Sequence, residues 1–386
     1  MRNQLVNYSV KNQNLAGIYI HIPFCKQACT YCNFHFSTSL AQKDVLLKAI
    51  EIEIADRVTS DEVIDSVYFG GGTPSLCSAK ELKHLLSALE NKVIFSKDVE
   101  ITLECNPDDL STTYLAEIFE LGINRLSIGI QSFYDSDLKF MNRAHNSTEA
   151  KTCIQNALTA GFENLTIDLI YGSPTTSNEM WTENIKRALD SGIHHLSSYA
   201  LTVEEKTKLN HDVKKGKVFV NEETAAAQFD ILLDQIKDYG FEQYEISNFC
   251  KEEKYAKHNT AYWQGSSYVG LGPAAHSYDG EKRRWNIANN ALYIKGVLGA
   301  SLYWEEEILS NRDRYNEYIM TGLRTKWGIN PDEIPNLFGH EMDIYFQKTL
   351  AEHPYKDKLL IKDGNITITE EGRFFADAIA ASLFKV

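Results

Sequence analysis

The chain has 386 residues, 43% of them hydrophobic, and carries a formal net charge of -14 at pH 7. Its length predicts one large domain with smaller appendages. The excess of acidic residues argues against nucleic acid as a partner, because phosphate backbones are bound by clustered Lys and Arg.

The chain begins with a polar stretch. Residues 1–16 have no packing pattern and are expected to form a flexible leader. They lack the apolar run of a signal peptide, and no stretch of the chain approaches the about 18 apolar residues of a membrane span. We therefore expect a cytoplasmic protein with no membrane span, a condition that still allows peripheral association with a membrane.

Short β-rich runs alternate with longer helical patterns between residues 17 and 250. This βα alternation predicts a parallel sheet wrapped by helices. Six strands favour an incomplete, open (β/α)6 TIM-like barrel over a closed one with eight strands. The predicted strands are 18–22, 63–69, 99–104, 125–130, 165–170 and 195–200, and the clearest helical patterns are 41–58 and 147–160.

The segments just after the predicted strands have unusual compositions. They read CKQACTYC, GGGTP, ECNPDD, QSF and YGSP. Ligands of parallel α/β folds gather at the carboxyl ends of the strands. These five segments therefore mark the expected functional site.

The pattern changes towards the end of the chain. Residues 251–300 are expected to connect the barrel to a winged-helix-like α+β module over 301–386. In this module, helices 312–325 and 341–350 precede a hairpin that turns at Asp363-Gly364-Asn365, and a helix over 369–383 closes the chain. Because helix 341–350 is not basic, a packing or lid role is favoured over DNA reading.

Three of the seven cysteines stand together as C-x3-C-x2-C on the loop after the first strand. Thiolates of Cys25, Cys29 and Cys32 would leave one iron of a [4Fe–4S] cluster open. The amine and carboxylate of S-adenosylmethionine can chelate such an iron, and one-electron transfer would then release a 5′-deoxyadenosyl radical. The alternative is a structural zinc site, with His21 or His35 as the fourth ligand. The other four cysteines are expected to be buried thiols: Cys77, Cys105, Cys153 and Cys250.

The cysteine spacing, Tyr19 and GGGTP together resemble the radical SAM superfamily. The motifs YIHIPFC, YFGGGTPS, LECNP, IGIQSF, NRAH and IDLIYG, in this order, resemble more closely the oxygen-independent coproporphyrinogen III oxidase family and its heme-chaperone relatives, the HemW proteins. The resemblance covers nearly the whole chain from Ile18 onward. It implies contacts to the methionyl part of S-adenosylmethionine from Gly71, Gly72 and Thr73, and further cofactor contacts from Tyr19, Glu104, Gln131, Arg143 and Asp168.

The two branches of this family differ in function, and three features of the chain favour the chaperones. The oxidases carry a fourth cysteine where this chain has Phe34, and their N-terminal part is longer. Residues 258–263, HNTAYW, match the HNxxYW motif of the heme chaperones. The alternative for this motif is structural, with its histidine capping a strand and its aromatic residues filling the core.

The resemblance thus implies a heme chaperone that carries a cluster with bound S-adenosylmethionine, with a coproporphyrinogen III oxidase as the alternative. His258 is the expected iron ligand, Tyr262 and Trp263 would offer apolar faces to the porphyrin, and His276 is a second candidate ligand. We expect heme at the seam between barrel and C-terminal module, near the open side of the cluster. The implied partners are heme, heme-accepting proteins such as respiratory ones, and an electron donor.

One further motif resembles a cofactor site but lacks its context. Gly270 to Ala275 read GLGPAA, which mimics a dinucleotide fingerprint. The acidic residue expected about twenty positions later is missing, so nicotinamide or flavin binding is not predicted. The sequence assigns no catalytic residue.

Overall fold

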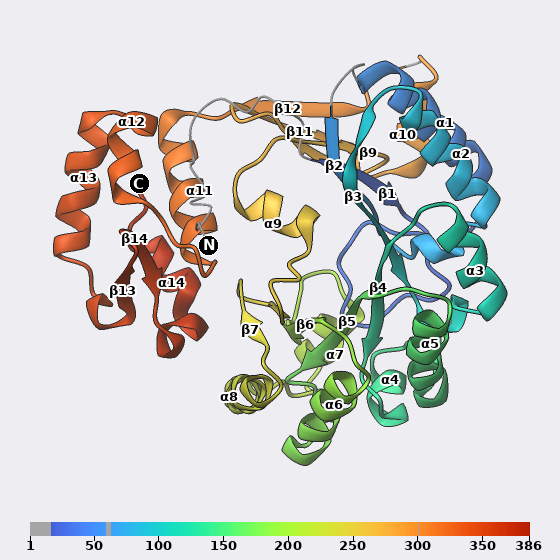
Figure 1. The fold of residues 1–386 in the computed structure, drawn as a ribbon, viewed down its shortest axis with the longest axis horizontal. Coiled ribbons are helices and arrows are strands. Elements are labelled where there is room, and N and C mark those ends of the chain that lie inside the picture. The colour runs from blue at the N-terminus through green and yellow to red at the C-terminus, as the bar shows by residue number, and fades with distance from the viewer. Residues whose placement is uncertain (1–16, 59–62, 300) are drawn as a thin grey trace.

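The computed structural model describes residues 17–58, 63–299 and 301–386. The expected leader, 1–16, lies outside these residues. Figure 1 shows a curved sheet with helices around its outer side, one helix (α9) on its inner side, and a C-terminal module beside it. Within the described part of the chain, every helix falls short of the length and apolarity that a membrane crossing needs.

The centre of the sheet consists of the six predicted strands, and the open parallel barrel is confirmed. They pair in sequence order as parallel neighbours. Their bounds are β1 (Gly17–Ile22), β2 (Val63–Gly71), β3 (Ile94–Cys105), β4 (Arg125–Gln131), β5 (Asn164–Tyr171) and β6 (His195–Ala200).

Six further strands extend this sheet at both edges, and the sequence patterns did not predict them. On one side β9 pairs parallel with β1, and β10, β11 and β12 follow as antiparallel strands; on the other side β8 and β7 follow β6. Residues 251–300, expected only to connect two domains, therefore supply three strands of the sheet. The added strands are β7 (Glu242–Gln243), β8 (Asn248–Cys250), β9 (Tyr268–Leu271), β10 (His276–Tyr278), β11 (Lys282–Asn286) and β12 (Trp304–Ile308).

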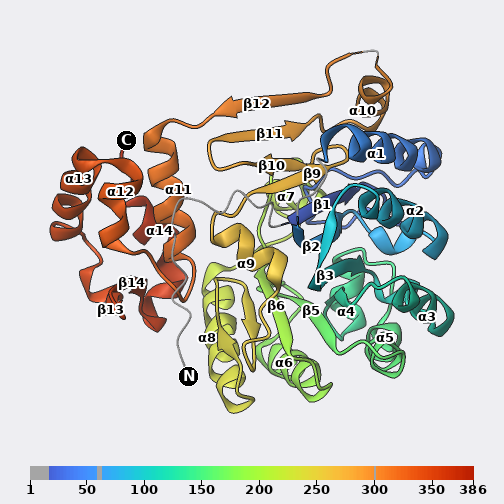
Figure 2. The same ribbon diagram turned by 45° about the horizontal axis from the view of Figure 1, so that its top comes forward.

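Helices cover the outer face of the sheet and form most of the C-terminal module (Figure 2). Those before the module are α1 (Lys43–Arg57), α2 (Ala79–Glu90), α3 (Thr112–Glu120), α4 (Asp135–Phe140), α5 (Ser147–Thr159), α6 (Asn178–Asp190), α7 (Lys208–Lys214), α8 (Glu222–Asp238), α9 (Lys257–Trp263) and α10 (Asn290–Val297). Those in the module are α11 (Asn311–Leu323), α12 (Ile334–Phe338), α13 (His340–Ala351) and α14 (Ala376–Ala381).

Alternation along the strands separates the core from the inner face of the barrel. Successive side chains of a strand point to opposite faces. In β1, Ile18 and Ile20 are fully buried in the main hydrophobic core, whereas Tyr19 between them keeps part of its surface accessible. In β2, Val67 and Phe69 belong to the same core, and Tyr68 between them is also partly accessible. The polar residues of the predicted site therefore line the inner face.

The C-terminal module has its own hydrophobic core, which includes Tyr315, Ile319 and Phe346. The predicted hairpin is present as β13 (Leu359–Lys362) and β14 (Asn365–Ile368), and its turn residues Asp363 and Gly364 both have positive φ. The helix predicted over 369–383 is wrong in part. Residues 370–375 form a 3-10 helix and only 376–381 are α-helical. The Thr369 side chain accepts a hydrogen bond from the Gly372 N–H, which tightens this turn.

Candidate functional site

The three clustered cysteines lie on the loop that leaves β1. The Cys25 N–H donates to the Ser37 carbonyl at 3.0 Å, and the Ser37 N–H donates to the Pro23 carbonyl at 2.8 Å, so the loop is closed at its base. Cys25, Cys29 and Cys32 are free and partly buried, whereas the other four cysteines are buried as expected. All three thiols of the loop are thus available at the carboxyl end of one strand.

Residues 140–143 brace this loop from the end of α4. The Thr30 N–H donates to the Met141 carbonyl at 3.0 Å, and the Asn142 side chain donates to the Ala28 carbonyl at 2.8 Å. Arg143 Nη1 lies 3.4 Å from the Cys29 sulfur. The NRAH motif therefore places a positive charge beside the cysteines.

The glycine-rich segment after β2 lies against the base of the cysteine loop. The Gly72 N–H donates to the Ile22 carbonyl at 2.9 Å, and the Thr73 N–H donates to the Phe24 carbonyl at 2.7 Å. A Cβ atom added to Gly72 would lie 2.7 Å from the Phe24 backbone. Gly71 has φ of +109°, a conformation that favours glycine. The glycines permit this close contact between the two loops.

Two carboxylates stand on the inner face, Glu104 near the end of β3 and Asp168 in the middle of β5. Glu104 accepts hydrogen bonds from the Tyr68 hydroxyl at 2.8 Å and from the Gly71 N–H at 3.0 Å. The Ser127 hydroxyl lies 3.3 Å from both oxygens of Asp168. Burial, and then the charge of Glu104, raise the pKa of Asp168 to about 7; burial also raises the pKa of Glu104.

Arg143 and Gln131 meet at the end of β4. Arg143 Nη2 donates to the Asn106 side chain at 2.7 Å and to the Gly129 carbonyl at 2.9 Å, while its buried Nε has no hydrogen-bond partner among the described residues. Gln131 is buried and has φ of 64°, at a register shift between β4 and β5. Strained backbone of this kind concentrates at binding sites. Arg143 thus joins the cysteine loop to this strand end.

These residues fit a [4Fe–4S] cluster with S-adenosylmethionine better than they fit zinc. Within the described residues, no group of three or more His, Cys, Asp or Glu side chains is arranged to hold a single metal ion. A four-iron cluster takes each thiolate on a different iron, so its ligands stand farther apart. The two candidate fourth ligands of zinc are engaged in hydrogen bonds. The His21 ring is hydrogen-bonded to the Tyr19 hydroxyl and to the His35 carbonyl, and His35 Nε2 is hydrogen-bonded to the Asn290 side chain. The Nε–H of Arg143, which has no partner among the described residues, is a donor that the carboxylate of S-adenosylmethionine could accept from.

His258 lies on the inner side of the barrel, away from the cysteines. Its Nδ1 is 2.9 Å from the Ser66 hydroxyl, and its ring centroid is 5.2 Å from that of Tyr68. Ser66 pairs with Gly17, the first residue of β1, whereas the cysteine loop follows the last residue. The first and last residues of β1 are five residue steps apart, about 16 Å at the usual rise. His258 thus contacts the opposite end of β1 from the cysteine loop, and the placement of heme near the cluster stays a prediction.

The rest of the HNTAYW motif connects the barrel to the C-terminal module. The Asn259 side chain donates to the Tyr244 hydroxyl at 3.3 Å, and Arg324 of the module lies over the Trp263 ring at 5.3 Å from its centroid. Tyr262 is 49% exposed. The motif forms helix α9 and does not cap a strand. His276, the second ligand candidate, is exposed on β10 and stacks on Trp285.

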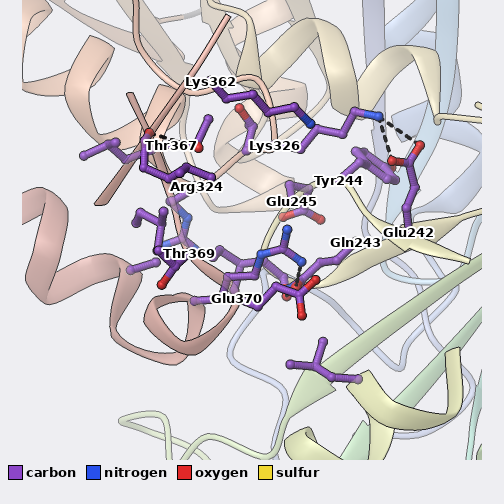
Figure 3. Close-up of a pocket in the computed structure, with 18 of the residues that line it drawn as sticks. Glu242, Gln243, Tyr244, Glu245, Arg324, Lys326, Lys362, Thr367, Thr369 and Glu370 are labelled. Atoms are coloured by element: carbon purple, nitrogen blue, oxygen red, sulfur yellow. Dashed lines mark hydrogen bonds and ion pairs between the residues drawn. The ribbon is translucent and has the colours of Figure 1, made fainter. Parts of the chain in front are cut away.

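A cavity of about 370 Å³ lies between the barrel edge and the C-terminal module (Figure 3). Lys326 Nζ is 2.8 and 2.9 Å from the two carboxylate oxygens of Glu242 on its wall. None of the residues predicted to bind the cluster, S-adenosylmethionine or heme lines this cavity. Of the residues that line it, Tyr244 and Arg324 contact α9.

The sequence analysis missed three residues of the inner face: Ser66, Tyr68 and Asn106. Ser66 and Tyr68 precede Gly70 at intervals of two in SVYFGGGTP. This spacing places their side chains on the same face of β2 as the glycine. Asn106 stands in the LECNP motif, two residues after Glu104. Period-two alternation continued from the motifs would have found all three.

Comparisons with known proteins agree with the motifs. A family model of the radical SAM superfamily matches residues 19–188, and a model of the HemN C-terminal domain matches residues 309–375. Among solved structures, coproporphyrinogen III oxidase (HemN) from Escherichia coli has a TM-score of 0.84 over 96% of this chain and 90% of that one, at 20% identity. At this identity the likeness shows a shared fold.

Curated relatives extend over nearly the whole chain. The heme chaperone HemW of Bacillus subtilis is 31% identical over 371 residues, which are 95% of this chain and 98% of the relative. The heme chaperone HemW of Mycobacterium tuberculosis is also 31% identical, over 95% of this chain and 94% of the relative. A mitochondrial radical S-adenosyl methionine domain-containing protein 1 of Bos taurus is 34% identical, over 95% and 87% respectively.

Proposed function

The chain belongs to the HemW heme chaperone family of radical SAM proteins, and from this membership we propose that it binds heme and transfers it to acceptor proteins. The observation that carries the proposal is His258 in the HNTAYW helix. Its ring is held at Nδ1 by Ser66, and Nε2 makes no hydrogen bond to the described residues. A neutral imidazole held at one nitrogen can bind iron through the other.

The cofactor site is proposed at the carboxyl ends of β1 to β5. Cys25, Cys29 and Cys32 hold a [4Fe–4S] cluster, which supplies an open iron and one electron. The residues proposed to contact S-adenosylmethionine are Tyr19, Gly71, Gly72, Thr73, Glu104, Gln131, Arg143 and Asp168. In this arrangement Arg143 pairs with its carboxylate, and the two acidic residues accept hydrogen bonds from its amine or ribose hydroxyls.

An oxygen-independent coproporphyrinogen III oxidase is the alternative function. The set of cysteine, glycine and carboxylate residues favours it, since radical decarboxylation would need the same cofactors. Phe34 occupies the place of the oxidases' fourth cysteine and therefore favours the chaperone. Its side chain is 69% exposed, so packing in the core is not the reason for an apolar residue at this position. The partners proposed with the chaperone function are heme acceptors, respiratory ones among them, and an electron donor, in the cytoplasm.

Heme titration tests the proposal. The wild-type protein is expected to give a saturable Soret band, and His258→Ala is expected to lose it while keeping its iron and sulfide content, since the cysteines lie at the other end of β1. His84→Ala is the matched control, because this histidine is exposed on α2 and belongs to none of the proposed sites. Wild-type affinity and spectrum in His258→Ala would contradict the assignment.

A further inference from the structure

The imidazole of His258 sits in a closely fitted position between β1 and β2. Its ring is tilted by 30° over Tyr68 and lies 6.3 Å, between centroids, from Tyr19. A Cβ atom on Gly17 would lie 2.8 Å from His258 Nδ1 and 2.5 Å from the Ser66 hydroxyl. Only glycine at position 17 leaves room for the contact between this histidine and this serine.

The backbone around His258 is fixed as well. The His258 N–H donates to Glu100 Oε1 at 3.3 Å, and Lys257 Nζ donates to the Asp98 carbonyl. Both acceptors belong to β3, next to β2 in the sheet. The start of α9 is therefore held by one strand while the imidazole is held by its neighbour, and the ring has little freedom to turn.

We propose that Ser66 is the positioning residue for His258. In this proposal, which rests on heme binding through His258, the Nδ1–H donates to the Ser66 hydroxyl oxygen and the lone pair of Nε2 is left for heme iron. A neutral imidazole carries its proton on one nitrogen only, so the bond at Nδ1 decides which nitrogen can bind a metal. A hydrogen bond to the second nitrogen of a ligating histidine also fixes the ring and raises its basicity.

The tautomer can be tested in the heme-free protein. If the serine hydroxyl instead donates to Nδ1, the proton stands on Nε2 and blocks the iron ligand. Nitrogen-15 NMR of histidine-labelled wild-type protein at neutral pH separates the two states, with His258→Gln identifying the signal. We expect the Nδ1–H tautomer in the wild type. The Nε2–H tautomer would overturn the proposal without any heme experiment.

Heme binding provides the second test. Ser66→Ala is expected to weaken heme binding about three- to tenfold, the usual effect of one lost hydrogen bond. It should also shift the iron–histidine stretch of the ferrous complex to lower frequency, because the imidazole loses electron density. Ser66→Thr, which keeps the hydroxyl, should restore both values. Ser198→Ala is the control: this serine is buried in β6, and its hydroxyl has no hydrogen-bond partner in the part of the chain that the structure describes.

The outcomes distinguish this inference from the proposed function. If His258→Ala loses heme but Ser66→Ala matches Ser198→Ala in affinity and stretch, the role of Ser66 is wrong and the chaperone assignment stands. If His258→Ala keeps the wild-type spectrum, the proposed function fails at its main residue. A weakened complex in Ser66→Ala, restored by threonine, supports both.

Discussion

At the scale of single residues, the cysteine side chains on the loop after β1 are the proposed ligands of the cluster. Cys25, Cys29 and Cys32 are free, and Arg143 places a positive charge 3.4 Å from the Cys29 sulfur. Anaerobically reconstituted protein is expected to contain about four irons and four sulfides, as in four-iron clusters. Replacing any of the three cysteines with Ala should abolish the cluster, because each thiolate serves a different iron.

Iron and sulfide analysis of the purified proteins checks this prediction. Cys153→Ala is the control, since this thiol is buried in α5 and belongs to the hydrophobic core. Stoichiometric zinc without sulfide would contradict the cluster.

A second prediction at this scale concerns Glu104. Its carboxylate is bonded to Tyr68 and to Gly71, directly beside the proposed position of S-adenosylmethionine. Glu104→Gln removes a charged partner of the ligand's amine and should weaken binding by roughly 1.5 to 3 kcal/mol. Equilibrium binding to the reconstituted protein measures this, with exposed Glu117→Gln on α3 as control. Equal affinity in both variants would remove Glu104 from the site.

Asp168 makes stability depend on pH. Burial and Glu104 raise its pKa to about 7 in the folded protein, against about 3.9 in the unfolded chain. The folded state therefore holds this proton more tightly, so the stabilising contribution is full below about pH 4 and is lost as pH rises to about 7.

Asp168→Asn should remove that loss. Near pH 4 the free energies of unfolding of the variant and of the wild type should differ little. At pH 8 the free energy of unfolding of the variant should be greater than that of the wild type by about 1 to 4 kcal/mol. Urea unfolding of cluster-free protein across this range measures the difference. A difference that does not change with pH would show that the pKa of Asp168 is the same in the folded and the unfolded protein.

At the scale of elements, one buried carboxylate joins four of them. Glu53 of α1 is fully buried and pairs with Arg57 at 2.9 Å. It also accepts hydrogen bonds from the Gly272 N–H after β9, from Asn286 of β11 and from Tyr293 of α10. The edge strands beyond β1 are thus fastened to α1 through Glu53 and through Arg57, which donates to the Gly270 carbonyl and to the Ser277 hydroxyl.

Glu53→Ala should lower the free energy of unfolding by about 3 to 5 kcal/mol, because it leaves the charge of Arg57 unpaired and removes the acceptor of the Gly272 N–H and the Tyr293 hydroxyl. Glu51→Ala on the same helix should cost less than about 1 kcal/mol, since its partner Lys48 is exposed. Urea unfolding compares the two. Similar losses would mean that the buried network contributes little.

The same network gives the GLGPAA motif a structural reason. A Cβ atom on Gly270 would lie 1.9 Å from the His276 carbonyl oxygen, and Gly272 has φ of +93°. These glycines permit a tight connection between β9 and β10. A fingerprint read by spacing alone could not separate this strand turn from a nucleotide loop.

Elements with long, regular patterns were predictable, and short ones were not. Each of β1 to β6 could be found because apolar residues alternate or run together over at least six positions. Strands β7 to β12 have two to five residues, too few to show a period. Helix α9 has seven residues and ends in two aromatic residues, so its sequence resembles a strand as much as a helix.

At the scale of the whole molecule, the sequence indicated which residues to expect in the candidate site but not where they stand relative to one another. The cysteine, glycine and carboxylate segments meet because they follow neighbouring parallel strands, a relation that strand order alone provides. The contact of His258 with Ser66 joins residues 192 positions apart across the barrel. It depends on the path of the chain after β8, for which the sequence has no periodic signal.

The central claim is that a radical SAM barrel with an HNTAYW helix serves here to carry heme. One anaerobically reconstituted preparation should be given heme and coproporphyrinogen III in parallel, with S-adenosylmethionine and a reductant present. We expect a saturable, His258-dependent Soret band and no formation of protoporphyrinogen IX. Conversion of coproporphyrinogen at an enzymatic rate, with heme binding unaffected by His258→Ala, would contradict it.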